Sequence, residues 1–111
     1  MSKFGLYSNK SSISFESHLN GLEEETKILL LNLRDFVKSF GDNVIEEIRP
    51  HRIVYAKSLT FRYFLDIQPR KDILAISIIK SRKEPATEHI VKNVQEIENI
   101  KSEIADAYEK I

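Results

Sequence analysis

The chain of 111 residues contains no cysteine, so disulfide bridges and thiolate metal sites are excluded. No apolar run approaches the roughly 20 residues that a membrane-spanning helix needs. The first residues, Met1–Ser12, also lack the apolar segment of a secretory signal. These absences favour a cytoplasmic protein with no membrane partner.

Glycine is also scarce, with three residues in the whole chain. A serine-hydrolase nucleophile elbow needs a serine on a strained turn flanked by glycines, and a phosphate-cradling loop needs several glycines close together. Gly5, Gly21 and Gly41 are far apart in the sequence. Neither kind of site can be built from them.

The residues that could support other chemistry are dispersed. His18, His51 and His89 lie in separate segments, without the spacing of zinc ligands. A magnesium-dependent nuclease of the restriction type needs an Asp on one strand and an acidic-x-Lys pair on the next. Asp66 and Lys80 are present, but the second acid is missing, and we expect Asp66 to pair with Arg62, Lys57 or Lys80 instead. The sequence therefore predicts no enzyme, no metal and no cofactor.

What the chain does contain is enough apolar material for a packed core, because 41% of its residues are hydrophobic. Its length suits one domain. The polar composition of residues 1–12 predicts a loosely ordered N-terminal arm, and residues 13–111 are expected to form a single α+β domain.

Two segments have the periodicity of amphipathic helices. Asn20 lies three residues before Glu23, and Asn93 lies three before Glu96, the spacing of a capping box. Apolar residues follow each cap at spacings of three and four, and the first helix is predicted to stop at Gly41. The expected buried positions include Leu29, Leu33, Phe36, Val37, Ile97, Ile100, Ile104 and Tyr108.

Between these helices the period changes to that of strands. Residues 52–57, 61–68 and 73–80 are rich in β-branched and aromatic side chains, and residues 89–92 could form a short fourth strand. Alternation along 61–68 should place Tyr63 with Leu65 on one face, and Arg62 with Phe64 on the other. The predicted fold is α+β, with two long helices packed on one face of a three- to four-stranded antiparallel sheet.

Several positions also carry a family resemblance. Phe64, Ile67, Pro69 and Lys71, with Ile53 and Tyr55 before them and the pair Ala107-Tyr108 near the end, match the spacing of a domain family of unknown function. The chain resembles this family from about residue 14 to residue 108. Its members are found at the C-terminus of bacterial and archaeal proteins labelled "predicted transport protein". The resemblance implies the architecture, and no activity follows from it. The family's usual insertion before the last strand is missing here, where only residues 80–88 fill the interval.

The net charge of the chain is zero, but the charges are unevenly distributed. Residues 49–83 hold nine basic and two acidic side chains, whereas the segments before and after them are acidic. Such a basic segment with interleaved aromatic residues could follow a nucleic-acid backbone. The candidate phosphate contacts are Arg62, Arg70, Lys71, Arg82 and Lys83, and Tyr63 is the candidate for base stacking.

Two alternatives remain open at this level. Basic side chains on strands also discourage edge-to-edge aggregation and pair with acidic helices. Ile28 and Leu31 lie off the main stripe of the first helix, so they either pack under the sheet or form an exposed partner surface. The sequence thus predicts a small non-catalytic accessory domain that binds nucleic acid or another polyanion. The alternative is a protein-interaction scaffold that acts as a homodimer without nucleic-acid binding.

Overall fold

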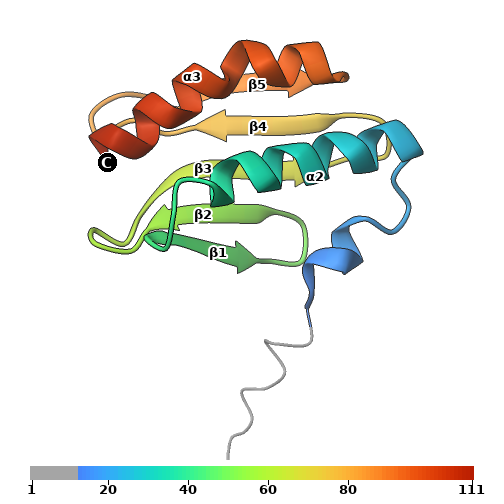
Figure 1. Cartoon of the computed structure of the whole chain (residues 1–111), viewed down its shortest axis with the longest axis horizontal. Coiled ribbons are helices and arrows are strands. Elements are labelled where there is room, and N and C mark those ends of the chain that lie inside the picture. Colours follow the sequence, from blue (N-terminus) through green and yellow to red (C-terminus); the bar gives the residue numbers. More distant parts are fainter. Residues whose placement is uncertain (1–12) are drawn as a thin grey trace, which may run out of the picture.

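A computed structural model describes residues 13–111, and the expected N-terminal arm lies outside this range. A short 3-10 turn, η2 (Phe15–His18), precedes helix α2 (Glu24–Lys38), and helix α3 (Val94–Lys110) ends the chain. Between the helices lie β1 (Val44–Ile48), β2 (Ile53–Lys57), β3 (Arg62–Pro69), β4 (Leu74–Ile78) and β5 (Thr87–Val91). The strands pair in sequence order, each antiparallel to the next, and both helices lie across the same face of the sheet (Figure 1).

The predicted α+β architecture with an antiparallel sheet is confirmed, and the described part of the chain has one strand more than expected. The additional strand is β1, whose sequence Val-Ile-Glu-Glu-Ile interrupts the apolar alternation. Glu46 points to the helix side of β1, where Arg34 of α2 donates two hydrogen bonds to it. A charged residue on the packed face hid this strand from pattern analysis.

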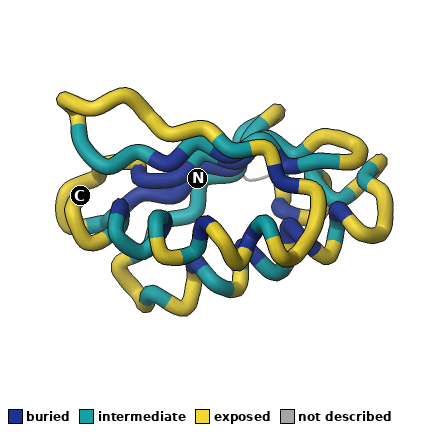
Figure 2. The backbone as a smooth tube through the Cα atoms, turned by 90° about the horizontal axis from the view of Figure 1, so that it is seen from above, coloured by how far each residue is buried: buried dark blue, intermediate teal, exposed yellow. Residues whose placement is uncertain are grey.

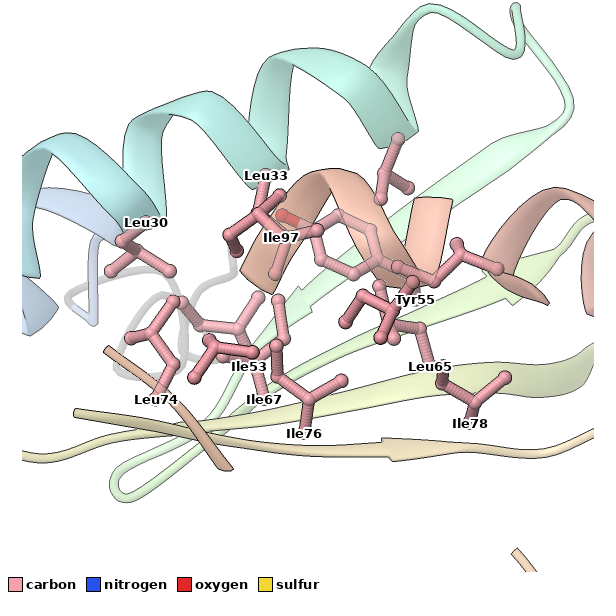
Figure 3. Packing of buried hydrophobic residues seen from close by; sticks show 14 of the residues in the cluster. Leu30, Leu33, Ile53, Tyr55, Leu65, Ile67, Leu74, Ile76, Ile78 and Ile97 are labelled. Carbon is pink, nitrogen blue, oxygen red and sulfur yellow. The ribbon is translucent and has the colours of Figure 1, made fainter. Parts of the chain in front are cut away.

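The hydrophobic core lies between the sheet and the two helices. Leu30 and Leu33 of α2 and Ile97 of α3 point toward the sheet (Figure 3). They meet side chains from the three middle strands, among them Ile53, Tyr55, Leu65, Ile67, Leu74, Ile76 and Ile78. Buried backbone accordingly follows the middle of the sheet and recurs on the helix turns that face it (Figure 2).

The predicted cap of α3 is confirmed and that of α2 is wrong. The Asn93 side chain accepts a hydrogen bond from the Glu96 amide at 2.9 Å, and the Glu96 carboxylate accepts one from the Lys92 amide. Helix α2, by contrast, begins at Glu24 without a side-chain cap, because the chain turns at Gly21 with a φ of 84°. The Glu23 amide donates to the Lys71 carbonyl at 2.9 Å instead, which ties the start of α2 to the β3–β4 turn.

A β-bulge changes the faces predicted for β3. Tyr55 of β2 pairs with Leu65, whereas the next residue, Ala56, pairs with Tyr63, so Phe64 is an extra residue in β3. Phe64 is fully buried, and its ring lies 5.3 Å from that of Tyr108. Tyr63 therefore lies on the face away from the helices, and the prediction that it shares a face with Leu65 is wrong. Arg62 pairs with Lys57, which reaches Tyr108 on the helix side, so the prediction that Arg62 shares a face with Phe64 is confirmed.

The meander gives the sheet two ends with different contents. One end, here called the Phe61 end, holds the β2–β3 turn, the β4–β5 loop and the end of α3. The other, the Arg70 end, holds the β1–β2 and β3–β4 turns together with η2 and the start of α2 (Figure 1).

Candidate polyanion interface

The nine basic side chains of residues 49–83 divide into two groups. Four are partly buried and bound within the chain. Arg49 pairs with Glu47 at 2.8 Å, Arg52 with Asp66 at 2.8 Å and Lys80 with Glu103 at 3.8 Å, and Lys57 donates to the Tyr108 carbonyl at 3.1 Å. The other five are exposed and have no carboxylate partner within residues 13–111: Arg62, Arg70, Lys71, Arg82 and Lys83. They are the five side chains that the sequence predicts for phosphate contacts.

Two of these contacts, Arg49–Glu47 and Arg52–Asp66, neutralise the middle of the sheet face that the helices leave open, whereas Lys57 and Lys80 contact α3 on the covered side. Asp66 lies opposite Val54 in β3, and Arg52, two residues before Val54, reaches it along the same face. The predicted partners of Asp66 were Arg62, Lys57 or Lys80, so that prediction is wrong. The second carboxylate oxygen of Asp66 is buried without a hydrogen-bond partner in the described part of the chain.

Two of the five unpaired basic residues lie at the Arg70 end. Arg70 and Lys71 line an open pocket of about 440 Å³ between the β3–β4 turn, the β1–β2 turn and the segment that follows η2. His18, His51, Ser17, Asn20 and Gln68 complete its polar lining, in which no described residue is acidic. The His18 imidazole is hydrogen-bonded to the Arg49 carbonyl at 2.6 Å, which holds η2 against the sheet. This end offers cationic and hydrogen-bonding groups to an anion.

Arg62 and Arg82 gather at the Phe61 end. They line a second pocket of about 300 Å³ with Phe61, Tyr63, Ile79, Ser81 and Ile111, here called the Phe61 pocket. Alternation directs Arg62 and Tyr63 to opposite faces of β3, yet both border this pocket because it lies at the start of the strand. Lys83 follows in the exposed β4–β5 loop, where its backbone amide donates to the Ser81 hydroxyl.

The two basic ends are separated by the length of β3. Arg62 opens this strand and Arg70 directly follows it. At about 3.3 Å per residue, the eight steps along the chain from Arg62 to Arg70 span roughly 26 Å. The sequence-predicted residues thus form two clusters with a neutralised centre between them.

Tyr63 is less free for stacking than the sequence suggests. The Arg49 guanidinium lies 5.1 Å from the centre of its ring, and Arg49 donates to its hydroxyl at 2.7 Å. The hydrogen bond with Glu47 also raises the pKa of Arg49. The ring that sequence analysis missed is Phe61, which is 77% exposed. Its signal was present, since a bulky apolar residue lies in the turn-prone run from Ser58, but its β propensity assigned it to the strand.

Three of the residues considered for metal chemistry, His18, His89 and Asp66, have other contacts. Within residues 13–111 no three His, Asp or Glu side chains are grouped so that they could hold a metal ion. His89 is 3.0 Å from Glu103, on the helix side of the sheet. None of the described helices has the length and apolarity to cross a membrane.

Comparison of the chain with protein-family models, with curated proteins and with solved structures finds no match. The resemblance to the family of unknown function therefore stays a prediction, and the functional argument depends on the geometry of the basic ends.

Proposed function

We propose that this protein is a non-catalytic binding domain for a nucleic-acid strand, which it holds by its phosphates at both ends of the sheet. One observation carries the proposal. Of the nine basic side chains in residues 49–83, four contact acceptors within the chain. The other five lie at the two ends of the sheet, with Arg70 and Lys71 at one end and Arg62, Arg82 and Lys83 at the other.

The physical argument concerns charge compensation. An exposed guanidinium or ammonium without a carboxylate neighbour gains more from a phosphate than one that already shares its charge with an acid. Three of the five are arginines, whose fork of donors matches phosphate oxygens. Because the centre of the open face is neutral, a bound strand would be held at the Arg70 end and the Phe61 end and would cross the centre without strong contacts.

The alternative function, a homodimeric interaction domain, has its own support on the helix side. Ile28 is 55% exposed and Val94 is 41% exposed. Together with Glu25, Leu29, Lys92 and Asn93 they line an apolar groove of about 290 Å³ between the starts of α2 and α3. Such exposed apolar groups are typical of partner surfaces.

Charge reversal tests the proposed function. Arg70→Glu and Arg82→Glu should each weaken binding of a fluorescently labelled single strand, whatever its sequence, and each should reduce the slope of log K against log salt by about 0.7, the value for one lost phosphate contact on a single strand. Lys101→Glu makes the same change in net charge in the middle of α3, on the helix-covered side of the sheet, and should leave the slope unchanged.

The measurement is fluorescence anisotropy at salt concentrations between about 50 and 200 mM. Absence of wild-type binding at low salt, or an equal effect of all three variants, would contradict the proposal. If wild type fails to bind and self-associates in sedimentation, the homodimer alternative takes its place.

A further inference from the structure

The Phe61 pocket differs in chemistry from the polar pocket at the Arg70 end. Most of its lining is apolar and includes Phe61, Tyr63, Ile79 and Ile111, while Arg62 and Arg82 line the same pocket. No acidic side chain within residues 13–111 lines it. A ligand that fits must combine an apolar, polarisable part with negative charge.

Phe61 has no evident role in the fold. The residue is 77% exposed, so its burial contributes little to stability. Its backbone has a φ of 56°, the left-handed region, which is rare for a bulky residue and costs on the order of 1–3 kcal/mol. The turn is closed by the Phe61 amide, which donates to the Lys57 carbonyl at 2.7 Å, and glycine could make that bond with less strain. An exposed aromatic residue kept in this conformation is better explained by a ligand than by folding.

A nucleobase with its phosphates has the required chemistry. A base is flat and stacks on aromatic rings, whereas the flanking phosphates suit arginine. The volume of about 300 Å³ lies at the lower end of small-ligand sites, which start near 300 Å³. In a duplex the faces of each base are covered by its neighbours, so only an unpaired base can enter. An acidic peptide with an aromatic side chain could offer similar groups, but arginines paired with an exposed ring match a phosphate-linked base more closely.

We propose that the Phe61 pocket binds one unpaired nucleobase, with Phe61 as the stacking platform and with Arg62 and Arg82 on the adjacent phosphates. This inference rests on the proposed function, because it names the form of nucleic acid that the basic ends select. It makes the protein a single-strand binder, and it transfers the main stacking role from Tyr63 to Phe61.

The test compares three ligands of equal length: a single strand, the same strand with abasic sites and a duplex. Wild type should bind the single strand most tightly. Phe61→Gly removes the ring and relieves the backbone, so the variant should fold. It should lose about ten-fold in affinity for the single strand, the scale of one stacked base, and almost nothing for the abasic strand. Leu59→Ala is the control, because Leu59 is 74% exposed in the same turn and lies outside the pocket lining.

The outcomes separate this inference from the proposed function. If wild type binds all three ligands equally, the basic ends bind phosphate and the base pocket is wrong. If no ligand binds, the proposed function itself fails. Equal losses of Phe61→Gly for the single and the abasic strand would also overturn the inference. Self-association of the protein would likewise overturn the inference. So would displacement of the strand by an acidic aromatic peptide, if the protein also shows no preference among the three nucleic acids. Either result would identify a protein as the occupant of the pocket.

Discussion

At the scale of single residues, Glu46 is the clearest case of a charged group that serves packing. Its carboxylate, 13% exposed, accepts hydrogen bonds from Arg34 at 2.8 and 2.9 Å and from the Tyr55 hydroxyl at 2.7 Å. Burial alone would raise the pKa of Glu46, but the hydrogen bonds from Arg34 and Tyr55 outweigh it, so the pKa lies below its usual range. Burial, with the bond to Glu46, also raises the pKa of Tyr55. The network joins α2, β1 and β2.

Replacing Glu46 with Gln should destabilise the protein at pH 7 by about 1.5–3 kcal/mol, the usual worth of hydrogen bonds to charged groups. The folded-state pKa of Glu46 is depressed, so its contribution is full above the unfolded pKa near 4.3 and is lost as pH falls through the folded pKa. The difference in free energy of unfolding between wild type and the variant should therefore become smaller toward pH 3. Urea unfolding at pH 7, 5 and 3 measures it.

The matched control is Glu24→Gln, because the Glu24 side chain is 84% exposed and makes one surface pair with Lys27. We expect a change within about 0.5 kcal/mol at every pH. If the loss in free energy of unfolding caused by Glu46→Gln is the same at pH 7 and pH 3, it comes from the shape of the side chain and not from its charge.

At the scale of elements, local sequence patterns predict a helix end or a strand correctly when no tertiary contact with another element changes it. The Asn93 cap forms as expected because β5 delivers an extended chain directly into α3. The same spacing at Asn20 fails, since the turn at Gly21 and the bond from Glu23 to Lys71 decide where α2 begins. Likewise, β1 and the bulge at Phe64 depend on partners in α2 and α3, which pattern analysis of a strand does not include.

The two asparagines provide a direct test of this difference. Asn93→Ala removes the acceptor for the Glu96 amide and should cost about 1 kcal/mol, within the usual range of 0.5–2 for a lost N-cap. Asn20→Ala should change the free energy of unfolding by less than about 0.5 kcal/mol, because α2 has no side-chain cap. Denaturant unfolding of both variants at pH 7 measures the pair, and equal losses would mean that Asn20 also caps a helix in solution.

At the scale of the whole molecule, the sequence predicts which basic side chains are available but not how they are grouped. Composition identifies the basic segment, and the choice of Arg62, Arg70, Lys71, Arg82 and Lys83 agrees with the absence of carboxylate partners within residues 13–111. Their division into two clusters follows from the meander, which brings the β2–β3 turn and the β4–β5 loop to one end. Phe61 was not selected, because its exposure and its positive φ are tertiary properties that the sequence alone does not show.

This spacing predicts how binding depends on ligand length. The two ends lie roughly 26 Å apart along β3, and a stacked strand advances about 3.4 Å per nucleotide, so about eight nucleotides bridge them. Attachment at one end makes the second contact intramolecular and raises affinity well beyond that of either end alone. Affinity for oligothymidylates of four to twelve nucleotides should therefore increase steeply near eight and then level off. Arg70→Glu should remove the step, so that twelve nucleotides bind about as weakly as four, while Lys101→Glu, in the middle of α3, should keep it. Competition anisotropy measures the series, and a smooth increase with length in all three proteins would mean that the two ends act independently.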